Sequence, residues 1–125
     1  MAIQYQCSVV ALIRSRRRDT RLPDMHAQLT FFDGPRSPAE IAAADYAGRN
    51  RIQPALAGFD VRTYVLRRDD GSAVIITFAE DEQTLLDAQK AVLGTALLPD
   101  EDPALLPGAD RVEIYPVVRV TPEGA

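Results

Sequence analysis

The sequence predicts a single α+β domain in which two helices cover one face of a four-stranded antiparallel sheet. From residue 26 onward, the local patterns follow the order strand, helix, strand, strand, helix, strand. An Asp-Gly pair joins the two middle strands, and such a pair between alternating runs is a strong hairpin signal. The 125 residues are 46% hydrophobic and 26% charged, which suits one domain with a substantial core.

The first strand and the first helix each carry a clear local signal. Residues 26–32 alternate between polar and apolar side chains, and a turn follows at Asp33-Gly34-Pro35. Ser37 and Glu40 can form a capping box, with Pro38 at the first helical position. We expect this helix to run to about Gln53, because Pro54 ends or kinks it. Its buried stripe is predicted at Ile41, Ala44, Gly48 and Ile52, and an ion pair on its surface between Asp45 and Arg49.

The second half of the chain reads as a hairpin, a helix and a final strand. A two-residue turn at Asp70 and Gly71 would place Arg67 opposite Val74, Val65 opposite Ile76, and Thr63 opposite Phe78. The second helix is predicted from Glu82 to Leu93, capped by Asp81. Residues 99–110 read as a solvated acidic loop, and the last strand covers 112–120. Pro116 places that strand at a sheet edge, since proline cannot donate to a ladder.

This element order is the split βαβ, or ferredoxin-like, arrangement, whose strand order is 4-1-3-2. Sorting the strands by a period of two gives one nearly apolar set and one mixed set. We expect the apolar set to lie under the helices. The mixed set bears large apolar side chains that predict a two-fold dimer interface; they are Phe32, Tyr64, Leu66, Ile75 and Tyr115.

Four segments between the first helix and the second form a recognisable series: 56–59 (Leu-Ala-Gly-Phe), 64–68 (Tyr-Val-Leu-Arg-Arg), Asp70-Gly71, and 77–82 (Thr-Phe-Ala-Glu-Asp-Glu). This series resembles the dimeric α/β-barrel superfamily, including its antibiotic-biosynthesis monooxygenase-like group. The resemblance implies a homodimer over residues 25–120, with a small-molecule pocket between sheet and helices. Residues 1–24 would be an N-terminal extension with a possible extra strand and an Arg-rich arm, and residues 121–125 a C-terminal tail.

The resemblance also implies an activity: a cofactor-independent monooxygenase-like enzyme acting on a hydrophobic, aromatic or polyketide-like substrate. The alternatives are a cofactor-free cyclase or isomerase, and a non-catalytic binding or accessory protein of the same fold. Oxygenases of this kind use an Asn on the first strand and a Trp at the end of the third. Ala27 and Phe78 stand at those positions here. Haem-degrading members need a His on the second helix, which this helix lacks, so no haem is expected.

Two residues are candidates for catalysis, each with a structural alternative. His26 could act as a general base, or be an inert histidine at the dimer face. Tyr64 could donate to a substrate oxygen, or be a cross-strand aromatic at the interface. Arg62 could hold an anionic substrate or form an ion pair. The predicted pocket lining is Leu29, Phe31, Thr63, Val65, Ile76 and Phe78.

Composition and charge exclude several other classes. A formal net charge of -4 argues against non-specific nucleic-acid binding. The Arg cluster at 14–21 reads as a solvated arm or subunit contact, with a nucleic-acid or lipid patch as the alternative. The apolar run 9–13 is too short to cross a bilayer, and the Arg cluster follows it, unlike a signal peptide. With one Cys and one His, no metal site is expected. Arg-rich usage and the single Cys suggest a bacterial, cytoplasmic protein.

Overall fold

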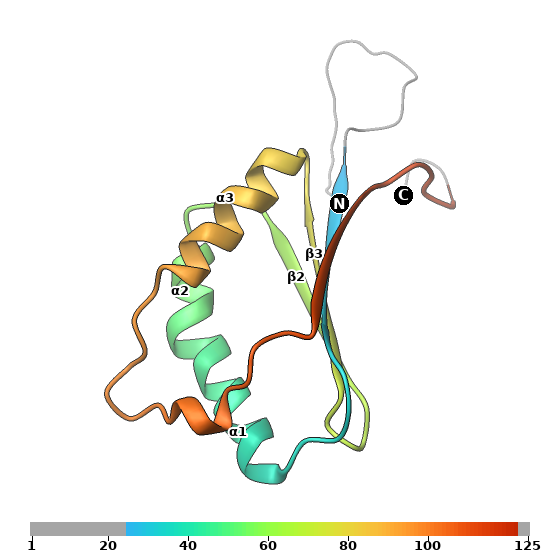
Figure 1. Ribbon diagram of the computed structural model, residues 1–125. Coiled ribbons are helices and arrows are strands. Elements are labelled where there is room, and N and C mark those ends of the chain that lie inside the picture. Colours follow the sequence, from blue (N-terminus) through green and yellow to red (C-terminus); the bar gives the residue numbers. More distant parts are fainter. Residues whose placement is uncertain (1–24, 123–125) are drawn as a thin grey trace.

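The computed structural model describes residues 25–122, and the predictions for the N-terminal extension and its Arg cluster lie outside them. Four strands form one antiparallel sheet in the order β2-β3-β1-β4: β1 (His26–Phe32), β2 (Arg62–Arg67), β3 (Ala73–Ala79) and β4 (Arg111–Pro116). The helices lie together on one side of this sheet (Figure 1). The predicted α+β class and strand order are therefore confirmed, with β4 at an edge as Pro116 indicates.

The helices begin where the capping residues predict. Ser37 caps α1 (Pro38–Ala47): its hydroxyl accepts from the Glu40 N–H at 3.1 Å, and its own N–H donates to the Glu40 carboxylate at 2.8 Å. Asp81 caps α3 (Glu82–Leu93) by accepting from the Thr84 N–H at 2.8 Å. These bonds satisfy amide groups that have no partner within the helix. Both predicted starts are confirmed, as is the end of α3.

The first helix continues beyond its predicted end. A π-helical turn, η1 (Gly48–Ile52), follows α1 and leads into α2 (Gln53–Leu56), so the coil passes through Pro54. The Gln53 N–H bonds to the Gly48 carbonyl, five residues back. In a regular α-helix the Pro54 ring would clash with the carbonyl four residues earlier. A wider turn just before the proline relieves that clash, and the helix bends without ending.

The predicted register of the β2–β3 hairpin is wrong by one residue. The structure pairs Arg67 with Ala73, Val65 with Ile75, and Thr63 with Thr77. The Arg68 N–H bonds to the Ser72 carbonyl at 2.8 Å, so three residues, 69–71, form the loop instead of two. Three-residue loops need a residue with positive φ, and Gly71 supplies it with φ 92°.

Side chains alternate between the two faces of a strand. This one-residue shift therefore places every β2 side chain on the face opposite to the β3 side chains with which it was predicted to lie. Cross-strand pairing shows which side chains share a face of the sheet. We call the face under the helices the covered face, and it carries His26, Gln28, Thr30, Phe32, Thr63, Val65, Arg67, Ala73, Ile75, Thr77, Ala79, Val112 and Ile114. The opposite side, the open face, carries Ala27, Leu29, Phe31, Arg62, Tyr64, Leu66, Val74, Ile76, Phe78, Arg111, Glu113 and Tyr115.

Side-chain contacts identify which face lies under the helices. Arg67 of the covered face pairs with Asp45 of α1 at 2.9 Å. On the open face, the Arg111 guanidinium lies 3.8 Å from the Phe31 ring centre and pairs with Glu113, its neighbour on the same strand. The expected placement is therefore wrong for β1 and β3: their apolar alternate residues face away from the helices.

Candidate functional site

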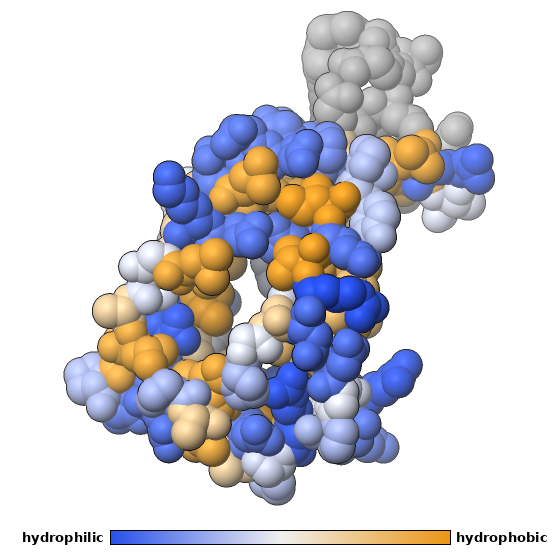
Figure 2. All heavy atoms as spheres, in the orientation of Figure 1, coloured by the Kyte–Doolittle hydropathy of each residue, from blue (hydrophilic) through white to orange (hydrophobic). Residues whose placement is uncertain are grey.

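The helix layer and the sheet are separated by a hollow. Figure 2 shows the surface opened between the helices, on the left, and the sheet, on the right. α3 packs on β1 and β3, and α2 packs on α3, whereas α1 packs mainly on η2 (Pro103–Leu105) of the loop before β4. Leu85 and Ala88 of α3 are nearly inaccessible. The sheet is therefore sealed under α3 and open to solvent under α1.

Exposure of individual residues supports the same arrangement. In a closed two-layer fold, central-strand side chains that face helices are fully buried. Here Gln28, Thr30, Ile75 and Thr77 all keep partial access to solvent. On α1, Ala44 is exposed although its position predicts burial. The predicted buried stripe of this helix is therefore wrong at Ala44.

The floor of the hollow has a polar row beside an apolar row. Cross-strand pairing aligns Gln28 of β1, Thr77 of β3 and Thr63 of β2, and the two threonine hydroxyls lie 3.3 Å apart. The next row consists of Thr30 flanked by apolar side chains; these are Val65, Ile75 and Val112. Such a floor can take a molecule with an apolar body and a polar edge.

Two buried polar atoms in this floor have no hydrogen-bond partner in the described part of the chain. They are the Nδ1 atom of His26 and the Oε1 atom of Gln28, two residues apart on the covered side of β1. Leaving a buried polar group unpaired costs about 1–3 kcal/mol, so native proteins keep few such atoms. His26 lies near the start of α3, where its charge adds to the two Thr84 hydrogen bonds that chiefly lower the pKa of Asp81.

The structure divides the predicted pocket residues between the two faces. Thr63 and Val65 lie on the covered face as expected. The register carries the other four to the open face: Leu29, Phe31, Ile76 and Phe78. Conversely, the predicted interface residues Phe32 and Ile75 lie on the covered face, while Tyr64, Leu66 and Tyr115 lie on the open face. The extra loop residue before Ser72 puts the β2 side chains on the face opposite to the β3 residues that were expected beside them. In addition, Leu29, Phe31, Ile76 and Phe78 face away from the helices.

The two catalytic candidates are on opposite sides of the sheet. His26 lies on the covered face, not on the dimer face where alternation with Gln28 and Thr30 had placed it. Tyr64 lies on the open face, where its hydroxyl is 3.5 Å from Arg62 and its ring meets the Phe78 ring edge-on at 6.1 Å. The two side chains therefore cannot act on one molecule within a single subunit.

The open face is largely apolar and accessible. Tyr64, Leu66 and Tyr115 are 47%, 49% and 51% exposed. Five further apolar side chains between them keep partial access: Leu29, Phe31, Val74, Ile76 and Phe78. Its charged groups lie on the outer strands: Arg62 and Arg111 are at strand starts, and Glu113 lies within β4, opposite Leu29. A contiguous apolar surface of this kind is typical of an interface.

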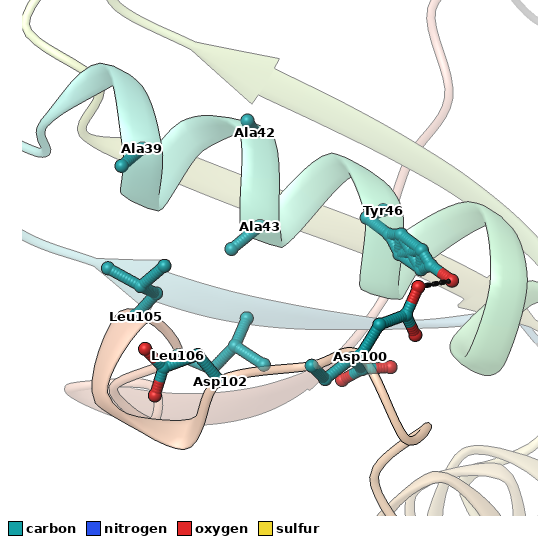
Figure 3. Close-up of a pocket in the computed structure, with 9 residues that line it drawn as sticks. Ala39, Ala42, Ala43, Tyr46, Asp100, Asp102, Leu105 and Leu106 are labelled. Carbon is teal, nitrogen blue, oxygen red and sulfur yellow. Dashed lines mark hydrogen bonds between the residues drawn. The ribbon is translucent and has the colours of Figure 1, made fainter.

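A second cavity, of about 370 Å³, lies between α1 and the loop before β4. Figure 3 shows Ala39 and Ala43 of α1 facing the loop before β4. These residues and Ala42 line the cavity on one side, and Leu105 and Leu106 line it on the other. Tyr46 closes one end, where its hydroxyl donates to Asp100 at 2.7 Å. That hydrogen bond raises the pKa of Tyr46 above its ordinary value.

The loop beside this cavity is anchored at Glu101, so its prediction as a solvated acidic loop is wrong there, whereas Asp100 and Asp102 are exposed as predicted. The Glu101 side chain is only 3% exposed and receives the Arg51 guanidinium at 3.0 Å. Arg51 also donates to the Thr95 hydroxyl at 2.9 Å. The predicted Asp45–Arg49 pair is likewise replaced, since Asp45 pairs with Arg67. Sequence separation of 50 residues hides the Arg51–Glu101 pair from any local pattern.

Sequence reasoning missed Gln28 and Thr77 as site residues. The available signal was the alternation of His26, Gln28 and Thr30, which gives a central strand three successive polar positions on one face, before Phe32. A polar face on a strand flanked by two others needs hydrogen-bond partners or solvent access. That requirement points to a functional surface.

Within residues 25–122, no group of three or more His, Cys, Asp or Glu side chains is placed to hold a metal ion. Over the same range, none of the helices has the length and apolar character needed to span a bilayer. Comparison with known proteins found no matching family model and no matching curated protein.

Proposed function

We propose that this chain is a homodimeric enzyme that binds a hydrophobic small molecule between α1 and the covered face. The single observation that supports the proposal most strongly is the polar row of Gln28, Thr77 and Thr63 on the covered face, which keeps access to solvent and lies next to the buried, unpartnered polar atoms of His26 and Gln28. Proteins keep such costly groups where binding or catalysis uses them. The apolar row beside them would hold the body of the substrate.

His26 is the general base of this proposal. A neutral imidazole accepts a proton near neutral pH and can abstract one from an activated phenol or enol. The resulting carbanion can add O2 at carbon, and loss of water from the hydroperoxide leaves a carbonyl. One CH2 group and one O2 thus become one C=O group and one water, so no further reductant is needed. Without O2, return of the proton to a different carbon would give isomerisation or cyclisation.

The dimer is proposed to form through the open face. A two-fold axis through this face would bring the apolar centres of two sheets together and remove their side chains from water, at about 25 cal/mol per Å² buried. It would also place the hollows on the outer sides of the assembly, where substrate can enter. Tyr64 and Tyr115 would then be interface residues rather than catalytic ones.

A non-catalytic binding role is the second candidate. Ala27 and Phe78 stand where the oxygenases that this chain resembles have Asn and Trp, and both lie on the open face, away from the hollow. The same floor could hold a ligand without chemistry. The two roles differ in whether His26 is needed for turnover or only for binding.

A two-stage experiment tests the proposal. Purified protein is screened for ligand-induced thermal shifts with hydroxylated aromatic compounds, and hits are followed by oxygen uptake and by proton exchange in D2O. The His26→Phe variant should lose at least 100-fold in turnover while still binding, which corresponds to about 2.7 kcal/mol of transition-state stabilisation. Binding with no uptake and no exchange would support the binding role. No shift with any compound would count against both.

A further inference from the structure

Arg67 lies at one end of the covered face, where an ion pair joins the sheet to α1. It shares a cross-strand row with Ala73 and Phe32, next to the apolar row that includes Val65. Its Nη2 atom donates to the Asp45 carboxylate of α1 at 2.9 Å. The guanidinium therefore stands beside the apolar part of the floor and faces the helix layer.

This end of the hollow is open to solvent at the groups that a ligand would meet. The Arg67 and Asp45 side chains are 28% and 40% exposed. Val65, two residues before Arg67 on the same face, is 59% exposed, although a strand side chain that faces helices is ordinarily buried. A molecule that rests on Val65 can therefore reach the Arg67 guanidinium.

The Arg67 guanidinium has donors available for a further partner. It carries five N–H groups, and among residues 25–122 its one side-chain hydrogen bond is the Nη2 bond to Asp45. A guanidinium binds a carboxylate best through two parallel N–H···O bonds. Ion pairs that are accessible to solvent contribute little to stability. A ligand carboxylate can therefore take the place of Asp45 at small cost, while the Asp45 carboxylate returns to water.

We propose that the hollow takes apolar carboxylic acids, and that Arg67 binds their carboxylate in exchange with Asp45. This inference rests on the proposed binding function and specifies its ligand class. The rows of the covered face give an order to the rest of the molecule. The apolar row next to Arg67 would hold a hydrocarbon body, and the hydroxyls of Thr77 and Thr63 in the row after it would meet a polar group.

The two members of the ion pair should affect binding in opposite directions. Arg67→Met removes the group that holds the ligand, whereas Asp45→Asn removes the carboxylate that competes with the ligand. If the pair only joined α1 to the sheet, both changes would act with the same sign, because either one weakens the same contact. Arg68→Met is the matched control, since it removes the same charge one residue later, at an exposed position beyond the end of β2.

The binding experiment uses 2-naphthoate and 2-naphthamide, which have nearly the same shape but differ in charge. Titration calorimetry on the full chain at pH 7 should show that the natural protein and Arg68→Met bind 2-naphthoate about tenfold more tightly than 2-naphthamide, or better. Arg67→Met should bind the two compounds within about a factor of two of each other. Asp45→Asn should bind 2-naphthoate about three- to tenfold more tightly than the natural protein does, and 2-naphthamide equally well. Circular dichroism verifies that each variant is folded.

The outcomes separate this inference from the binding function. Opposite shifts in Arg67→Met and Asp45→Asn, with Arg68→Met unchanged, support the inference. Equal binding of the two compounds by the natural protein, or weaker binding of 2-naphthoate in both ion-pair variants, would overturn it while the binding function stands. Binding of neither compound would also overturn it, and the hydroxylated aromatic compounds then test separately whether the hollow takes a ligand.

Discussion

In the two central strands, several positions of the covered and open faces carry the reverse of the side chains that a two-layer fold ordinarily gives them. Beneath the helices lie His26, Gln28, Thr30 and Thr77, while Leu29, Phe31, Ile76 and Phe78 point away. Apolar residues of a sheet are normally buried against its helices, and polar ones face water. The difference indicates that each face is adapted to a surface that one subunit alone does not supply.

The free energy of burial explains why both faces can persist in one protein. On the covered face only Ala79 is fully buried, together with Leu85 and Ala88 of α3 above the sheet. A single subunit therefore has a small sealed core, and the apolar centre of the open face leaves hydrophobic surface in contact with water. Dimerisation would bury that surface without filling the hollow.

A charge at the centre of the open face tests most severely whether this face is an interface. Ile76 lies between Leu29 and Tyr64 in the sheet, so Ile76→Asp would bury a carboxylate in the proposed interface. We expect the dimer dissociation constant to rise at least 100-fold, about 2.7 kcal/mol. Light scattering measures the assembly, and circular dichroism verifies that the subunit remains folded. Val118→Asp, at a 75% exposed site outside the sheet, is the control. A natural protein that scatters only as a 13.7 kDa monomer would contradict the dimer.

The hairpin loop that sets the two faces can be disturbed directly. Gly71 has φ 92°, and a Cβ atom added there would lie 2.7 Å from the Arg36 Cβ. Gly71→Ala should therefore lower the free energy of unfolding by about 2 kcal/mol, as measured by urea denaturation. Gly58→Ala is the matched control, because nothing lies within 4 Å of its added Cβ. Equal stabilities for the two variants would show that this loop does not depend on glycine.

The seal over the covered face depends on the start of α3. Asp81→Ala removes the cap and should cost about 1 kcal/mol. Two hydrogen bonds from Thr84 lower the pKa of Asp81 below its unfolded value of 3.8. Its contribution is thus complete above pH 3.8 and is lost as the pH falls through the lower, folded pKa. Urea denaturation between pH 2 and 7 should show a shallower acid slope in Asp81→Asn, which keeps an acceptor but does not titrate. An identical slope in both proteins would contradict this assignment.

A change in the polar row should have only a small effect on stability and a modest effect on ligand binding. Thr63→Val removes one hydroxyl of the Thr63–Thr77 pair at an exposed strand position. Unfolding free energy should change by less than about 0.5 kcal/mol. Binding of a ligand found in the screen should weaken by two- to fivefold, as calorimetry would report. Thr121→Val, which lies beyond β4, provides a control for the general effect of the substitution.

The parts of the fold that local signals determine could be predicted from the sequence. Ser37, Glu40 and Asp81 are capping residues whose partners lie three residues away, so the helix starts follow from short patterns. The order of the strands follows from the order of elements. The faces could not be predicted, because they depend on whether the loop before Ser72 holds two residues or three.

The candidate site was less accessible to prediction. His26 could be chosen from its residue type alone. That it lies on the other face of the sheet from Tyr64 depends on the cross-strand register. The hollow results from the distance between α1 and the sheet, which no run of residues encodes. The cavity beside the loop depends on the Arg51–Glu101 pair, whose partners are 50 residues apart in the chain. Each of these features is set by tertiary packing.

The π turn at Gly48–Ile52 has a consequence for how this chain could change by insertion or deletion. One extra residue within a helix turns everything after it by about 100° relative to a regular α-helix. Arg51 lies within that turn, and from there it reaches both Glu101 and Thr95. Deleting one residue of the turn would restore regular winding, bring Pro54 against a carbonyl, and rotate Arg51 away from its carboxylate. One residue of this helix thus governs the ion pair that holds Glu101, fifty residues later, while the Tyr46–Asp100 hydrogen bond before the turn would remain.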